Sequence, residues 1–197
     1  MKLRNSVRVI LLSLSVFVLP SQLLFAQKSN NDASAAFEKG SKTIGVTIGV
    51  GTNYDFFYYS GYTQYPLLGL IYDQGIVENV GPGTIGVGGI IAIKTAIDNY
   101  ANGFKARSNN FIIGARGTYH LTLLKNKNNK FDPYGGVTFG MRIYRYNDPF
   151  YNDSDNGVYP VAGLFVGAKY NFSKNFGAFS ELGYDISFFR LGICANF

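Results

Sequence analysis

The chain has no tryptophan, a single cysteine and a single histidine, and only 15% of its 197 residues are charged. One cysteine, Cys194, excludes a disulfide within the chain, so the fold draws its stability from another source. A lone cysteine late in a strand-like segment is typically a small buried residue. His120, the single histidine, is the only base of its kind that could activate a nucleophile, so acid–base catalysis is not favoured.

The chain also lacks an apolar run long enough for a membrane helix. The longest, residues 9–19, has 11 residues, whereas a spanning helix needs about 20. Residues 1–26 begin with three basic residues, continue into this run and end at Ala26, which predicts a cleaved signal peptide and export through the inner membrane. Residues 27–197 keep 15 basic and 12 acidic side chains. The basic ones are scattered, so nucleic-acid binding is not expected.

Glycine and aromatic residues are abundant: there are 24 glycines, and aromatics make up 16% of the chain. Residues 27–41 are polar and aperiodic, and they are expected to form a flexible lead-in. From residue 43 every second residue is aliphatic, beginning with Ile44, Val46, Ile48 and Val50, and the residues between are Gly or Thr. A period of two with unlike faces predicts a β-strand.

Eight segments share this alternation: residues 43–51, 68–76, 84–94, 111–121, 134–144, 161–172, 176–185 and 188–197. About ten residues is the length of a tilted strand that crosses the hydrocarbon core. The connections 52–66, 95–109 and 146–159 are expected to be long loops, and 77–83, 122–131 and 172–176 short turns. This arrangement predicts an all-β fold, a single antiparallel transmembrane β-barrel of about eight strands over residues 42–197.

The charged residues of these segments fall on the Gly/Thr face. They are Asp73, Lys94, Arg116, Arg142, Lys169, Glu181, Asp185 and Arg190. In a membrane barrel this face lines the lumen and the aliphatic face meets lipid, whereas a soluble periplasmic barrel would have the opposite arrangement. Glycine leaves room for long basic side chains inside a narrow barrel, which favours the membrane form. Acids and bases are then expected to pair across the lumen, in either a plugged structural barrel or a narrow, cation-repelling pore.

Several motifs resemble small outer-membrane β-barrel proteins of Bacteroidota and, more distantly, barrels of the OmpA/OmpX type. The motifs are Phe37-Glu38-Lys39-Gly40, Tyr119-His120, Asp132-Pro133-Tyr134-Gly135-Gly136 and Phe179-Ser180-Glu181-Leu182-Gly183-Tyr184. The resemblance implies the outer membrane as location and its lipid and lipopolysaccharide as surroundings. It also implies that Phe197 is the assembly signal read by the barrel-assembly machinery.

For function, a non-enzymatic structural or surface-interaction role is the first hypothesis, and an extracellular ligand is unknown. The first long loop carries a candidate contact surface: Tyr54, Phe56, Phe57, Tyr58, Tyr59 and Tyr62. A narrow porin-like channel for small solutes is the alternative, and a lipid A-modifying enzyme a third reading. No catalytic, cofactor-binding or metal-binding residues are predicted, because His120 belongs at the periplasmic end and the acidic residues of loop 146–159 lack a calcium-loop spacing.

Overall fold

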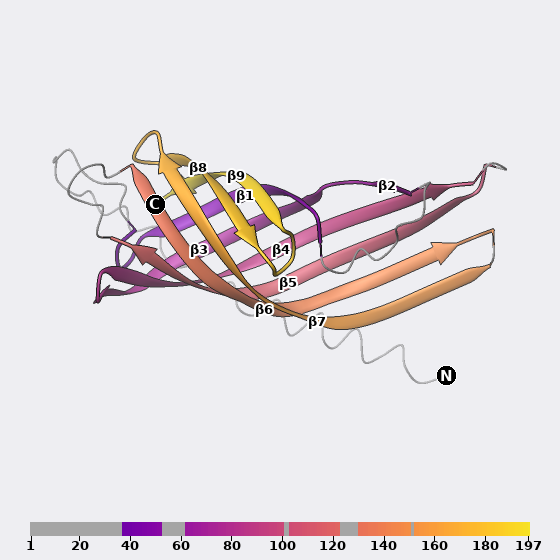
Figure 1. Cartoon of the computed structure of the whole chain (residues 1–197), viewed down its shortest axis with the longest axis horizontal. Coiled ribbons are helices and arrows are strands. Elements are labelled where there is room, and N and C mark those ends of the chain that lie inside the picture. Colours follow the sequence, from indigo (N-terminus) through magenta and orange to yellow (C-terminus); the bar gives the residue numbers. More distant parts are fainter. Residues whose placement is uncertain (1–36, 53–61, 101–102, 123–129, 151) are drawn as a thin grey trace. The chain divides into compact units, whose positions relative to one another are not determined.

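A computed structural model of the chain describes residues 37–52, 62–100, 103–122, 130–150 and 152–197. The predicted signal peptide and most of the predicted lead-in lie outside these residues. Within them the chain forms β-strands (Figure 1), and no helix is long and apolar enough to cross a membrane. The strands are β1 (Lys42–Val50), β2 (Tyr62–Gln64), β3 (Leu67–Val80), β4 (Gly83–Asn99), β5 (Lys105–Leu121), β6 (Phe131–Asp148), β7 (Asp153–Asn171), β8 (Phe176–Gly183) and β9 (Phe189–Asn196).

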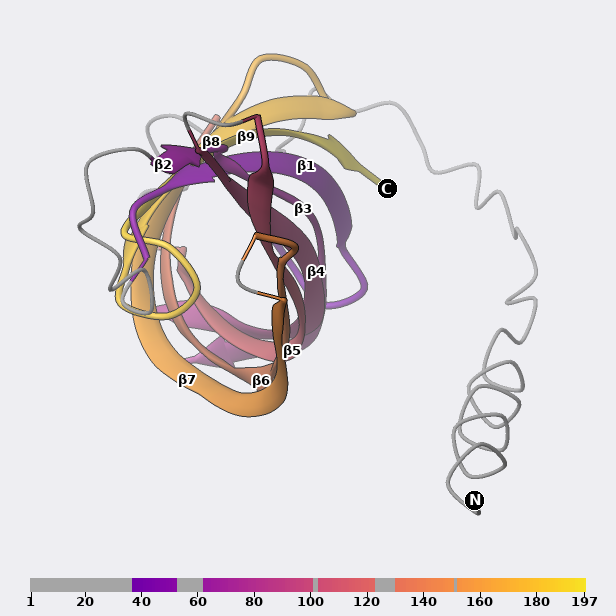
Figure 2. The same cartoon turned by 90° about the vertical axis from the view of Figure 1, so that its right-hand side faces the viewer.

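Eight of these strands close into one antiparallel ring. Each pairs with its neighbours in the order β4, β3, β1, β9, β8, β7, β6, β5, and β5 pairs again with β4. Figure 2 shows the ring end-on. The first and last strands meet along Thr43–Asn196 to Val50–Phe189, so no edge of the ring is left unpaired there. The short strand β2 pairs with Ala96–Asp98 of β4, beyond the part of β4 that pairs with β3. The predicted fold, an antiparallel barrel of about eight strands, is confirmed.

The alternation in the sequence is the alternation of the two barrel faces. Along β1 exposed and buried residues alternate without a break. The exposed face carries the large aliphatic and aromatic side chains, among them Phe139 at 69% and Leu164 at 68% exposure. The buried face carries Gly, Thr and the charges. Apolar side chains therefore point out and polar ones in, the reverse of a soluble barrel.

Two of the predicted long loops are wrong. Residues 95–109 and 146–159 were expected to be loops because their aliphatic alternation stops. Strands β4 and β5 instead continue to Asn99 and Lys105, and β6 and β7 to Asp148 and Asp153. In these extensions neither face of the hairpin contacts an apolar medium, so polar side chains occupy both faces. The ladder of backbone hydrogen bonds between the strands continues all the same. The hydrophobic pattern therefore ended before the strands did, and Figure 1 shows β4 to β7 extending beyond β1, β8 and β9.

The chain begins to pack before the first strand. Residues 27–41 were expected to be flexible, but the described part, from Phe37, is fixed against the barrel. Gly40 donates its N–H to the carbonyl of Gly75 at 2.9 Å, and Gly75 donates to Ser41 at 3.0 Å. The Phe37 side chain is only 2% exposed. The packed structure thus starts at Phe37, five residues before β1, and this segment lies at one mouth of the barrel.

Candidate functional site

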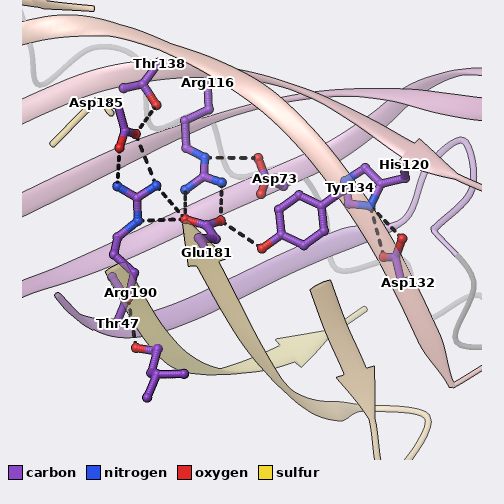
Figure 3. A network of polar contacts seen from close by, with 11 residues as sticks. Thr47, Asp73, Arg116, His120, Asp132, Tyr134, Thr138, Glu181, Asp185 and Arg190 are labelled. Carbon is purple, nitrogen blue, oxygen red and sulfur yellow. Dashed lines mark hydrogen bonds and ion pairs between the residues drawn. The ribbon is translucent and has the colours of Figure 1, made fainter. Parts of the chain in front are cut away.

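The centre of the lumen is filled by a network of buried charges, drawn in Figure 3. Glu181 of β8 lies between two guanidinium groups. Its Oε2 is 3.3 Å from Arg116 Nη1 and 2.7 Å from Arg190 Nε. Arg190 also donates to both carboxylate oxygens of Asp185, at 2.7 and 3.1 Å. Arg190 and Glu181 are 0% and 1% exposed, so these ion pairs are shielded from water.

Neighbouring side chains complete this network. Tyr134 donates its hydroxyl to Glu181 Oε1 at 2.8 Å, and Thr138 donates to Asp185 at 2.8 Å. Asp73 lies 3.9 Å from Arg116 Nε. The Phe165 ring lies under Arg116, with the guanidinium carbon 4.2 Å from the ring centre. The strand register explains the convergence, because Asp73, Gly88, Arg116 and Thr138 occupy one rung of the ring.

A layer of apolar side chains lies beside the charged layer, also inside the ring. The next rung toward the long hairpins carries Ile71, Ile90 and Val161, all buried. They belong to a cluster that also contains Leu67, Ala92, Ile112, Phe179, Ile186 and Cys194. Cys194 is a free, buried thiol, as expected. Charged and apolar layers together occupy the middle of the lumen, as in a plugged barrel.

A second polar cluster lies at the mouth where the chain enters. Both carboxylate oxygens of Asp132 are 3.0 Å from His120 Nδ1, and Lys169 Nζ is 3.3 Å from the same carboxylate. Phe37 covers the imidazole face to face, with ring centres 3.7 Å apart and planes 15° apart. Tyr134 stacks on His120 as well, at 4.9 Å between centres. The lead-in segment thus closes this mouth with an aromatic ring.

His120 and Asp132 form a histidine–carboxylate pair, which the sequence pattern did not reveal. In the described part of the chain His120 Nε2 has no hydrogen-bond partner, so no hydroxyl is placed for activation. Among the same residues no group of three His, Cys, Asp or Glu side chains is arranged to hold a metal ion. The imidazole of this pair is stacked between the rings of Phe37 and Tyr134.

All eight charged residues singled out in the sequence face the lumen. Seven are buried and Arg142 is half-buried. Asp73, Arg116, Glu181, Asp185 and Arg190 form the central network, and Lys169 lies in the mouth cluster. Lys94 donates to Thr52 at 3.2 Å and Arg142 to Asn110 at 2.8 Å, nearer the long hairpins. Arg142 also stacks over Tyr159, 4.7 Å from its ring centre.

The alternation in the sequence did not lead to the prediction of four further lumen residues, Asp132, Tyr134, Phe165 and Phe37. Asp132 and Tyr134 share the parity of Gly136 and Thr138. Tyr134 was therefore already on the inner side of the predicted strand 134–144, and extending that strand back to Phe131 would have placed Asp132 there too. Phe165 has the parity of Gly163 and Gly167. Phe165 was not predicted to face the lumen because large apolar residues were expected only on the lipid side. Nothing in the local pattern placed Phe37.

Most of the predicted aromatic contact surface lies outside the described residues. Tyr54, Phe56, Phe57, Tyr58 and Tyr59 are in that undescribed part, and the backbone of Tyr62 begins β2. A different aromatic group joins the tips of the two long hairpins. The Phe150 ring lies 5.4 Å from Tyr100 and 5.7 Å from Phe104, centre to centre. Tyr100 and Tyr146 both donate to the Asp148 carboxylate, at 2.7 and 3.1 Å.

The inner-face glycines have a role beyond the one expected, although a Cβ at Gly49 would indeed meet the Arg190 side chain. They were expected to make room for basic side chains. A Cβ at Gly192 or Gly45 would instead meet the Phe179 ring, and one at Gly136 the Phe165 ring. At Gly163 it would meet the backbone of Tyr184. The glycines therefore admit aromatic rings and allow neighbouring strands to approach closely in a strongly coiled sheet.

Phe37→Ala is expected to destabilise the barrel by about 3–5 kcal/mol, the usual cost of removing a buried phenylalanine ring. The ring contacts His120 and lies 5.3 Å from Lys169 Nζ, and both groups would become hydrated. Urea titration of the refolded protein in detergent, followed by gel mobility, measures the loss. Phe172→Ala is the control, since Phe172 is 56% exposed on the outer face. Equal midpoints for the two variants would contradict the proposed packing role of Phe37.

The closed ring, the outward apolar belt and the polar lumen define a small β-barrel of the kind found in outer membranes. No protein-family model matches the chain, and no curated protein matches it in sequence.

Two solved structures are similar in fold. Ail, the attachment invasion locus protein of Yersinia pestis, in complex with the heparin analogue sucrose octasulfate, shares 14% identity over 81% of this chain and 99% of that chain, with a TM-score of 0.50. The N-terminal β-barrel domain of Pseudomonas aeruginosa OprF shares 14% identity over 81% and 98% of the respective chains, with a TM-score of 0.48.

Proposed function

We propose that this chain is an integral outer-membrane barrel with a closed lumen, whose role is structural or lies in contacts made at the cell surface. The observation that carries the proposal is the pair of long hairpins, β4–β5 and β6–β7, which continue the sheet well past the apolar belt. Their tips are tied together around Asp148 and expose Phe104 and Phe150 at 46% and 43%. Exposed aromatic side chains on an ordered platform are typical of a contact surface.

The start of the first strand and the end of the last strand support an orientation with the long hairpins outside the cell. Lys42 and Phe197 exchange backbone hydrogen bonds at 2.9 and 3.1 Å, at the end of the barrel that carries the turns 81–82 and 172–175. In barrels of this kind short turns face the periplasm and longer extensions face the outside. In this orientation Phe197, which is 72% exposed, would lie at the periplasmic rim, where the proposed assembly signal would be accessible.

A channel function is disfavoured by the filled lumen. The central ion pairs, the Phe165 ring and the adjoining layer of Ile71, Ile90 and Val161 leave the middle of the barrel occupied by side chains. An enzymatic function is disfavoured because, among the described residues, His120 Nε2 has no hydroxyl or thiol as hydrogen-bond partner and the imidazole is covered by Phe37. The outer surface of the barrel and the long hairpins are therefore the parts to which the proposed function is assigned.

Planar-bilayer recordings of the refolded protein are expected to show no discrete conductance steps, since the central charges are paired and covered. The protein must first show a mobility shift between boiled and unboiled samples, which reports the folded barrel. Discrete steps in that material, absent from a boiled sample, would show that the lumen conducts and would support the channel function instead.

A cysteine introduced at Lys105 is expected to react with a membrane-impermeant maleimide on intact cells, because Lys105 lies at the exposed tip of β4–β5. The native Cys194 is buried in the lumen and supplies the unreactive background. A second variant, Lys174→Cys, places the thiol in the turn between β7 and β8, at the other end. Labelling of Lys174→Cys but not Lys105→Cys would reverse the orientation and exclude a surface role for the hairpins.

A further inference from the structure

The outward face of the long hairpins carries three basic side chains without an acidic partner. Lys105 and Arg107 lie on β5 and Arg145 on β6, all exposed. They line a pocket of about 440 Å³ together with Asn109, Tyr146, Asn147, Ser154 and Asn156. Within the described residues no carboxylate forms an ion pair with any of the three. The lumen cations Arg116, Lys169 and Arg190, by contrast, each contact a carboxylate.

The position of this pocket relative to the apolar belt is set by the strand register. The last apolar rung on the outer face runs through Leu68, Ile93, Phe111, Ile143 and Val158. One rung further out the paired residues are Asn109, Arg145 and Asn156. Residues two apart on a strand are separated by about 7 Å. The basic pocket therefore begins within about 7 Å of the edge of the lipid-facing belt, at the depth of lipid headgroups.

An apolar groove adjoins it at β5 and extends over the neighbouring strands β4, β3 and β1. The groove has a volume of about 320 Å³ and is lined by exposed side chains of four adjacent strands, with the backbone of Gly69 and Ala92 between them. These side chains are Val46, Leu68, Leu70, Ile91, Ile93 and Phe111. Phe111 lines the groove and Asn109 lines the basic pocket, so the two features adjoin along β5.

From this juxtaposition we infer that the outer surface of β3–β7 holds a lipid of the surrounding leaflet by a phosphate-bearing headgroup on Lys105, Arg107 and Arg145. One of its acyl chains occupies the groove beside Phe111. Guanidinium and ammonium groups are the phosphate ligands that proteins use most, and the Asn and Ser side chains of the pocket supply further hydrogen bonds. A soluble anion would use the basic pocket alone, whereas a lipid uses both features. The inference rests on the proposed membrane location.

This lipid site can be tested by native mass spectrometry of the refolded full-length mature protein. Phosphatidic acid and phosphatidylcholine with the same acyl chains are offered in equal amounts in detergent. The wild-type barrel is expected to retain phosphatidic acid in preference. The triple variant Lys105→Gln, Arg107→Gln, Arg145→Gln is expected to weaken this retention by about 100-fold, from the contribution of each basic residue near an anionic surface. The control triple Lys39→Gln, Lys42→Gln, Lys174→Gln removes the same charge at the opposite end and is expected to retain the lipid.

The outcomes separate the alternatives. Equal retention by wild type and the first triple, or equal loss in both triples, overturns the site. Glycerol 3-phosphate that displaces phosphatidic acid at equal concentration also overturns it, because the headgroup alone would then suffice. A Leu70→Gln variant, polar within the groove, is expected to weaken lipid retention without changing glycerol 3-phosphate binding. Failure of the proposed membrane location would be distinguishable, since the protein would then show no heat-dependent mobility shift at all.

Discussion

Glu181→Gln is expected to lower the free energy of unfolding of the barrel by about 3–5 kcal/mol, the typical cost of leaving a buried charge without its partner. The amide keeps the volume of the side chain but removes the charge that two arginines share. Arg116 would retain only Asp73, at 3.9 Å, and Arg190 only Asp185. Urea titration of the refolded protein in detergent, with mobility on an unboiled gel as readout, measures the change.

Glu78→Gln is the matched control, because Glu78 is exposed on β3 and its loss should change the midpoint little. A double variant, Arg116→Met with Glu181→Gln, is expected to lose less than the sum of the two single variants, because both single changes break the same Arg116–Glu181 ion pair. Additive losses would mean that Arg116 and Glu181 do not stabilise each other, and an unchanged midpoint for Glu181→Gln would remove the central network as a source of stability.

Gly163→Val is expected to prevent formation of the folded barrel. A Cβ at Gly163 would collide with the carbonyl of Tyr184 and lie 2.6 Å from the Asp185 Cα. An overpacked core side chain usually costs about 1–3 kcal/mol because neighbouring side chains can move. Here the obstructing atoms are backbone, which cannot rotate away without breaking the pairing of β7 with β8. The heat-modifiable band should be absent after refolding.

The control for this change is Gly117→Ala on β5. The nearest atom to a Cβ there is Val137 Cγ2 at 3.5 Å, an ordinary contact. This variant should fold with little change in its unfolding midpoint. A folded Gly163→Val barrel with a midpoint close to that of Gly117→Ala would show that the strands do not approach as closely as the structure places them.

The sequence alone determined the strands that face lipid and the side of each strand that does so. Period-two alternation is a local property, and a residue such as Phe139 or Leu164 points outward because its neighbours in sequence point inward. The same parity put Arg116, Glu181 and Arg190 on one face. The even number of predicted strands also put the start of the first strand and the end of the last strand on the same side of the barrel.

Only the tertiary structure decided which of the inward residues meet. Asp73, Arg116 and Glu181 come from three different strands, and their contact depends on the ring order and on the stagger between strands, neither of which local alternation records. The same holds for the stacking of Phe37 on His120. The hairpin extensions were also decided only by the tertiary structure. A strand whose two faces are both polar has no hydrophobic period, and the backbone hydrogen bonds that continue it do not depend on side-chain character.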